Sequence, residues 1–195
     1  DLSKGLRTGL IITGVILLLV FSLYSCVAGA YNSLVSADEA TKAAWSQVEN
    51  VYQRRFDLIP NLVNTVKGYA SHEEKVFTEI AEMRSRAGGV VQISGEALDN
   101  PETFEKFQKA QGELGGALQR LLSVAENYPE LKANENFRDL QSQLEGTENR
   151  IAVERKRFNE TVQQYNMLVR RFPQATFANM FGFREKPYFK AGERA

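Results

Sequence analysis

Apolar residues recur at alternating spacings of three and four in the first half of the chain, the pattern of a helix with one packed face. The series consists of Trp45, Val48, Tyr52, Arg55, Ile59, Leu62, Val66 and Tyr69. Arg55 is its only charged member. The pattern predicts a helix over residues 32–70, about 58 Å long at 1.5 Å per residue.

A second seam, near the C-terminus, repeats every seven residues, which is typical of helices that supercoil in bundles. Its members are Phe137, Leu144, Ile151, Phe158, Tyr165 and Phe172, with companions Leu140, Thr147, Glu154, Thr161 and Leu168. Three of the companions are polar and would require partners if buried. We predict one long helix here, capped by Asn134 and ended by Pro173.

Two shorter helices are predicted between the long ones. Ser71 and Glu74 resemble a capping box, and the glycine pair at 88–89 is expected to end that helix. A loop with a short extended "VVQIS" piece then leads to the next helix, which starts at the Asn100 cap and runs to the turn before Pro129.

These elements predict an all-α fold. We expect an N-terminal transmembrane helix, followed by an elongated antiparallel up-down four-helix bundle with two long and two shorter helices. The expected division is an N-terminal segment with the span over residues 1–31, the bundle over 32–172 and an aromatic tail over 173–195.

The run "LIITGVILLLVFSLYSCVA" over residues 10–28 has no charge and is long enough to cross a bilayer. It exceeds the ~7–15 apolar residues of a typical signal peptide, which favours a retained signal anchor. A lipoprotein signal ending at Cys26, in the lipobox-like "LYSC", and a cleaved signal peptide are the alternatives, so lipidation of Cys26 stays open.

Basic residues around this run give a weak orientation signal. Lys4 and Arg7 precede it, and Lys42 alone follows closely. Because cytoplasmic flanks carry the excess of Lys and Arg, we expect a single-pass membrane protein with an extracytoplasmic bundle. A cytoplasmic bundle is the alternative.

The stretch "RRFDLIPNLVNT" places a proline and a charged residue inside the first seam. Pro60 removes a backbone donor and crowds the preceding turn, so we expect a kink through which the seam continues. For Arg55 we predict a buried ion pair with Glu154, with Glu148 as substitute. The rest of this polar network is expected to be Asn61, Asn64 and Asn159. A ligand or partner site at the same patch is the alternative.

The two shorter helices cannot cover the long ones over their whole length, and the tail is too apolar to be free in water. We therefore expect contacts with a second copy or with the bilayer. The residues assigned to these contacts are Trp45, Tyr165, Phe172, Phe177, Phe181, Phe183, Tyr188 and Phe189. Docking of the tail on its own bundle is the third alternative.

The sequence offers little for chemistry. Its 24 basic and 24 acidic residues balance, which does not favour nucleic-acid binding. His72 is the single histidine, and no Glu-x-x-His motif accompanies it, although bundle di-metal sites use that motif. We expect no catalytic residue, no metal and no cofactor.

Three segments carry a family resemblance. They are "AWSQVENVYQRRFDLIPNLVNTVKGYASHE" (44–73), "LEGTENRIAVERKRFNETVQQYN" (144–166) and "FGFREKPYF" (181–189). They resemble the signature segments of the LemA family. The resemblance implies a bacterial membrane protein with one N-terminal span, an antiparallel helical bundle often placed in the cytoplasm, and no established enzymatic activity.

Two functions are therefore expected. The first is a non-enzymatic, membrane-anchored scaffold that forms homo-oligomers and organises or remodels the bilayer. The alternative is an adaptor that presents partners, such as a membrane protease or an envelope complex, through the tip formed by residues 68–74 and 127–132.

Overall fold

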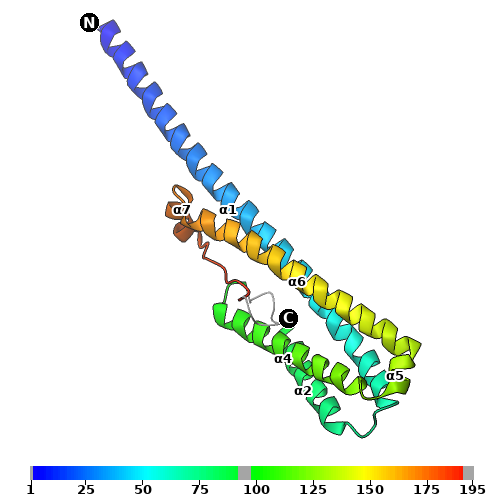
Figure 1. Ribbon diagram of the computed structural model, residues 1–195. Helices are drawn as coiled ribbons and strands as arrows, with labels where there is room; N and C mark the ends of the chain where they lie inside the picture. The colour runs from blue at the N-terminus through cyan, green and yellow to red at the C-terminus, as the bar shows by residue number, and fades with distance from the viewer. Residues whose placement is uncertain (1, 92–97, 191–195) are drawn as a thin grey trace. The chain divides into compact units, whose positions relative to one another are not determined.

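The structure, a computed structural model, describes residues 2–91 and 98–190, and all regular secondary structure in these ranges is helical (Figure 1). The helices are α1 (Leu2–Lys67), α2 (Glu74–Val91), α4 (Pro101–Ala125), α5 (Pro129–Ala133), α6 (Glu135–Arg170) and α7 (Gln174–Phe181). The predicted all-α class and the apolar N-terminal helix are confirmed for these residues. Part of the predicted "VVQIS" extended piece, from residue 92 on, lies outside the described residues.

Helix α1 joins the apolar N-terminal run and the first seam into one unbroken helix. Pro60 lies inside it, and Ile59 and Leu62 on either side are both buried. The predicted continuity of the seam through Pro60 is therefore confirmed, while the kink itself stays a prediction.

The chain divides into two compact units, and both long helices contribute to each. The first unit contains residues up to 39 and residues 164–185. The second contains residues 40–163 and those from 186 onward. These limits differ from our expected boundaries at 31/32 and 172/173, which stay predictions.

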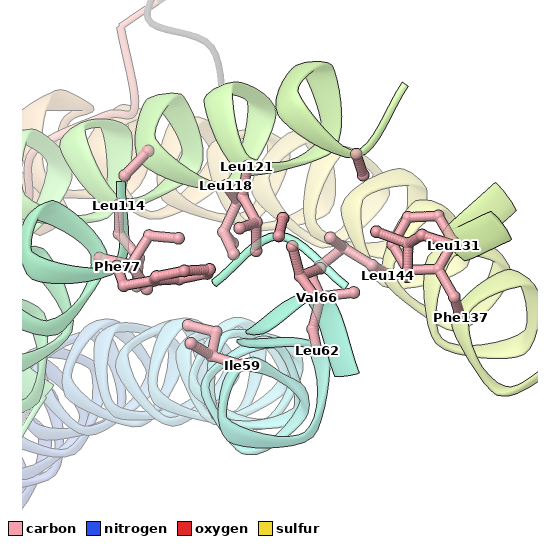
Figure 2. Close-up of a cluster of buried hydrophobic side chains, with 14 of the residues drawn as sticks. Ile59, Leu62, Val66, Phe77, Leu114, Leu118, Leu121, Leu131, Phe137 and Leu144 are labelled. Carbon is pink, nitrogen blue, oxygen red and sulfur yellow. The ribbon is translucent and has the colours of Figure 1, made fainter. Parts of the chain in front are cut away.

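The largest apolar core lies in the second unit, where α1, α2, α4, α5 and α6 all contribute side chains (Figure 2). It includes Ile59, Leu62, Val66, Phe77, Leu114, Leu118, Leu121, Leu131, Phe137 and Leu144. The α1 seam is buried up to Val66. Tyr69 departs from it because α1 ends at Lys67; its hydroxyl accepts a hydrogen bond from Asn134 Nδ2 at 3.0 Å.

Two predicted boundaries of the second helix are wrong. Helix α2 begins at Glu74, so Ser71 lies in the preceding turn and not at the cap. The glycine pair lies inside α2, which continues to Val91. A Cβ on Gly88 would lie 3.2 Å from Phe56 Cζ. Gly88 therefore permits close packing of α2 on α1 and does not end the helix.

Both predicted asparagine caps are confirmed. Asn100 Oδ1 accepts hydrogen bonds from the backbone N–H of residues 102 and 103. Asn134 Oδ1 accepts one from the N–H of Phe137 at 3.0 Å. Two short helices were not predicted: α5, in the turn at Pro129, and α7, which begins directly after Pro173.

In the first unit, α7 packs against α1 and the end of α6. Leu34, Tyr165, Val169 and Ala178 form its buried cluster. The ring of Tyr31 on α1 contacts Phe181 at 4.9 Å and Phe183 at 6.1 Å between centroids. The tail up to residue 185 is thus held on its own unit by aromatic contacts.

The glycine pair of α2 allows a matched test of helix packing. Nothing lies within 4 Å of a Cβ built on Gly89, so Gly89→Ala should stabilise the protein by up to about 1 kcal/mol through helix propensity. Gly88→Ala should gain clearly less, because the ring of Phe56 must shift. Chemical denaturation of both variants gives the comparison; equal gains would show that α2 does not depend on this close approach.

Candidate functional site

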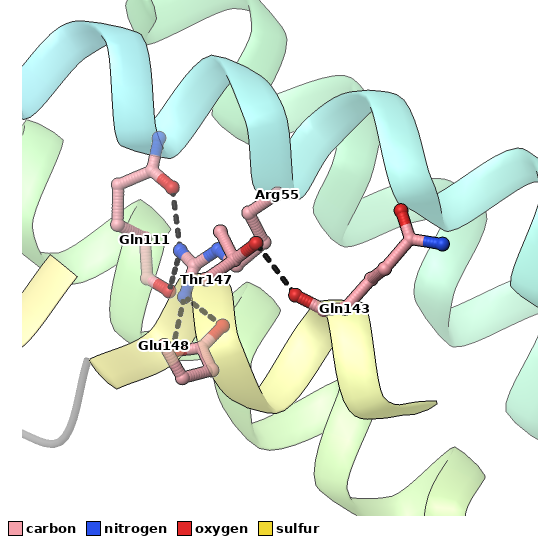
Figure 3. A network of polar contacts seen from close by, with 5 residues as sticks. All are labelled: Arg55, Gln111, Gln143, Thr147 and Glu148. Carbon is pink, nitrogen blue, oxygen red and sulfur yellow. Dashed lines mark hydrogen bonds and ion pairs between the residues drawn. The ribbon is translucent and has the colours of Figure 1, made fainter. Parts of the chain in front are cut away.

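The guanidinium of Arg55 is fully buried in the second unit, between α1, α4 and α6 (Figure 3). Its Nη2 donates to the backbone oxygen of Gln111 at 2.9 Å and to the side-chain Oε1 of the same residue at 2.6 Å. Its Nη1 lies 3.2 Å from Glu148 Oε1. One side chain of α1 is therefore bonded to both α4 and α6.

An aromatic ring and one nitrogen that is unpaired within the described part of the chain also characterise the environment of the Arg55 guanidinium. The guanidinium lies over the ring of Tyr52, 4.9 Å from its centroid, a cation–π contact. Arg55 Nε has no hydrogen-bond partner among the described residues. Burial raises the pKa of the Tyr52 hydroxyl, and the guanidinium groups of Arg155 and Arg55 oppose this rise.

The structure places the other residues predicted for this network elsewhere. Glu148, expected as the substitute, makes the ion pair, while Glu154 lies 3.8 Å from Arg157 on its own helix. Asn61 and Asn64 are exposed on α1. Asn159 is half-buried and binds the C-terminal segment.

Thr147, one of the polar residues in the second seam, lies close to Arg55 (Figure 3), and its hydrogen bond accounts for a polar side chain at this buried position. It is buried, and its hydroxyl donates to the backbone oxygen of Gln143 at 2.7 Å (Figure 3). Thr161 likewise donates to the oxygen of Arg157 at 2.9 Å. Threonine is tolerated in these positions because its own helix supplies the acceptor.

A second cluster of the same unit is aromatic and centres on Trp45. Its indole ring packs against Phe107 at 5.1 Å, Phe158 at 5.3 Å and Phe104 at 5.7 Å between centroids. The rings come from α1, α4 and α6. Phe189 of the C-terminal segment completes the cluster, stacking on Trp45 at 6.0 Å and lying 4.8 Å from Phe104.

Asn159 holds the backbone of Phe189 with two hydrogen bonds. Its Nδ2 donates to the Phe189 oxygen at 3.0 Å, and its Oδ1 accepts from the Phe189 N–H at 2.9 Å. This is the donor and acceptor pairing that a neighbouring β-strand would offer. The amide side chain thus satisfies both backbone groups of a buried, extended residue.

Charged contacts flank Phe189 on both sides. Lys186 Nζ lies 3.1 Å from Asp99, and Lys190 Nζ lies 3.0 Å from Glu105. The guanidinium of Arg155 lies over the Phe189 ring at 4.6 Å. The segment from 186 to 190 is therefore bound as an extended peptide by one aromatic anchor, one backbone pairing and two ion pairs.

The burial of each residue can be compared with its predicted role in contacts with a second copy or a bilayer. Trp45, Tyr165 and Phe189 are buried within the chain, which does not fit an exposed contact role. The others keep surface: Phe172 is 81% exposed, Phe181 41% and Tyr188 40%, while Phe177 and Phe183 are half-buried. For these five the role stays a prediction.

One helix, α1, has a stretch near its N-terminus that is long and apolar enough to cross a membrane, and that stretch is fully exposed. Within residues 2–91 and 98–190, no three His, Cys, Asp or Glu side chains are grouped so as to hold a metal ion. The predicted lack of a cofactor or metal stays a prediction.

Comparison with known proteins matches residues 44–195 to the LemA family. The chain is also similar to magnetosome protein MamQ 2 of Paramagnetospirillum magneticum, with 29% identity over 89% of this chain and 71% of the relative. Magnetosome protein MamQ of Magnetospirillum gryphiswaldense is 28% identical over 82% of this chain and 64% of the relative.

The first test addresses the Arg55 network. Glu148→Ala removes the only carboxylate in contact with a buried guanidinium, and breaking a buried pair costs ~3–5 kcal/mol. Because Glu148 is 31% exposed and water can enter, we expect a loss near the lower end. Glu160→Ala, which removes an exposed pair with Lys156 on the same helix, is the matched control and should cost under about 1 kcal/mol, as exposed pairs do. Equal losses in urea denaturation would contradict the assignment.

The second test uses Trp45, the single tryptophan, as a reporter of tail docking. Phe189→Ala should shift Trp45 emission to longer wavelength as water enters the cluster. It should also destabilise the unit by at most about 3–5 kcal/mol, the range for buried Phe→Ala. Asn159→Ala should give a similar shift, and Tyr188→Ala, the exposed neighbour, should give none. Unchanged emission in the first two variants would contradict docking in solution.

Proposed function

The chain belongs to the LemA family, and we propose that it is a non-enzymatic, membrane-anchored structural protein that self-associates and organises or remodels the bacterial membrane. The observation that carries this proposal is the course of α1. One helix contains the apolar run and then continues, without a break, into residues that pack in both units. We propose a single pass of this run through the inner membrane.

The arrangement of the remaining helices supports a structural role. We propose that α1, α2, α4 and α6 form an antiparallel up-down bundle, since side chains of all four meet in one core. The buried polar groups there bind residues of the same chain. The small excess of basic residues before the apolar run favours an extracytoplasmic bundle, and a cytoplasmic bundle is the alternative.

Exposed apolar side chains on α6 support self-association. Val153 is 62% exposed and Met167 51%. Val153 in the second unit and Met167 in the first unit each offer an apolar contact for a second copy. The relatives carry the name of the magnetosome, which supports a structural role in membrane organisation.

The mass of full-length protein in lipid nanodiscs or mild detergent, measured by light scattering, tests self-association. We expect several copies per particle. The double variant Val153→Asp with Met167→Asp should reduce the mass toward a single copy, because it places charge in an apolar contact. Gln163→Asp, on an exposed position of the same helix, is the matched control and should leave the mass unchanged. A single copy for the unmodified protein would overturn the proposal.

The adaptor remains the second candidate because of a hollow at the turn between α1 and α2. It has a volume of about 530 Å³ and is lined by Lys67, Ser71, Glu74, Phe77, Thr78 and Ala81. A protein partner could seat a side chain there. A photo-crosslinker at Ser71 should then form one reproducible adduct in cells, while one at the exposed Gln119 should not. Equal labelling from both positions would contradict the adaptor.

A further inference from the structure

Exposed apolar side chains gather around α7 in the first unit. Phe172, just before α7, is 81% exposed; Met180 is 73% and Phe181 41% exposed. Three large side chains on and beside one eight-residue helix form a patch of the kind that marks an interaction site. The opposite side of α7 is fixed by Ala178, which is buried in the unit's core.

The contacts of α7 fix its level along α1. Phe181 and Phe183 both pack on Tyr31, which lies three residues after the apolar run 10–28 that we assign to the bilayer. Three residues of helix correspond to about 5 Å. If the apolar run fills the hydrocarbon layer, α7 therefore lies at the height of the lipid headgroups, where aromatic side chains are favoured.

Basic side chains accompany this patch. Arg171 precedes α7, and Arg184 follows it. Both are exposed, and neither guanidinium forms an ion pair within the described part of the chain. Arg170 is already 3.8 Å from Glu185. Two cations beside an apolar patch have the composition of a surface that binds anionic lipid.

We propose that α7 is an interfacial helix: Phe172, Met180 and Phe181 insert among the lipid headgroups and upper acyl chains, while Arg171 and Arg184 bind anionic headgroups. This inference rests on the proposed membrane crossing of α1. A bilayer is the favoured occupant because α7 packs on Tyr31, three residues after the apolar run. The helix would hold the first unit against the bilayer and fix the rotation of α1 about its own axis.

Depth-dependent quenching in nanodiscs tests the position of α7. The full-length protein would carry Cys26→Ser and one labelled cysteine, at Met180, Val15 or Gln119. We expect lipid-borne quenchers near the headgroups to quench the label at 180, and deep acyl-chain quenchers to quench the label at 15. The label at 119, on the exposed face of α4 in the second unit, should stay unquenched by both.

The outcomes separate this inference from the proposed function. Quenching at 15 without quenching at 180 would leave the membrane anchor intact and overturn the interfacial helix. No quenching at 15 would overturn the anchor and, with it, this inference. Because Met180 is mostly exposed, its replacement leaves the core intact, and unchanged Trp45 emission would verify the fold.

The arginine contacts have their own test. In discs that contain phosphatidylglycerol, quenching at 180 should exceed that in pure phosphatidylcholine. The double variant Arg171→Gln with Arg184→Gln should abolish that excess. Arg138→Gln, an exposed arginine on the second-unit part of α6, is the matched control and should preserve it. An excess that survives the double variant would overturn the role of the two arginines.

Discussion

The buried charge of Arg55 constrains the second unit more than any other single group. Burying a guanidinium is costly unless its charge is compensated and most of its donors are bonded; in Arg55 both terminal nitrogens are bonded within the described residues and Nε is not. Gln111 supplies a backbone and a side-chain acceptor from α4, and Glu148 supplies the carboxylate from α6. A shift of any of these helices by one residue would separate at least one partner. We therefore propose that the pair fixes the register of the three helices, a role known for buried polar groups, while the surrounding apolar core supplies stability.

The aromatic cluster around Trp45 depends on a segment from the far end of the chain. Phe189 adds one more ring to those that α1, α4 and α6 supply, stacking on Trp45. An extended segment would leave its backbone groups unpaired there, at considerable cost. Asn159 removes that cost by pairing with both groups of Phe189. Phe189 of the C-terminal "KPYFK" is thus part of the core of the unit, and the two lysines of this segment form ion pairs with Asp99 and Glu105.

The helical class and both asparagine caps could be predicted because they rest on local patterns. Arg55 could be singled out because it alone breaks an apolar seam. Both candidate partners could be named, but not ranked: Glu154, a seam position, was preferred, whereas the arginine side chain reaches the substitute Glu148 beside the seam. The pairing of Asn159 with Phe189 could not be predicted from the sequence. A non-helical segment that packs on a helix produces no repeating pattern from which its partner could be inferred. The glycines of α2 were misread because a glycine that permits close packing looks, in sequence, like one that ends a helix.

The distribution of exposed and buried groups decides where function can lie. Arg55, Trp45 and Phe189 are buried and make their contacts within their own unit. These contacts stabilise the fold and are not available to a ligand. The large apolar side chains left exposed among the described residues include those on the N-terminal run of α1, Val153 and Met167 on α6, and three around α7. Such side chains contribute free energy only when another surface covers them, at about 25 cal/mol per Å² of apolar area. We propose lipid as the cover for the first set and for α7, and a second copy for the side chains on α6.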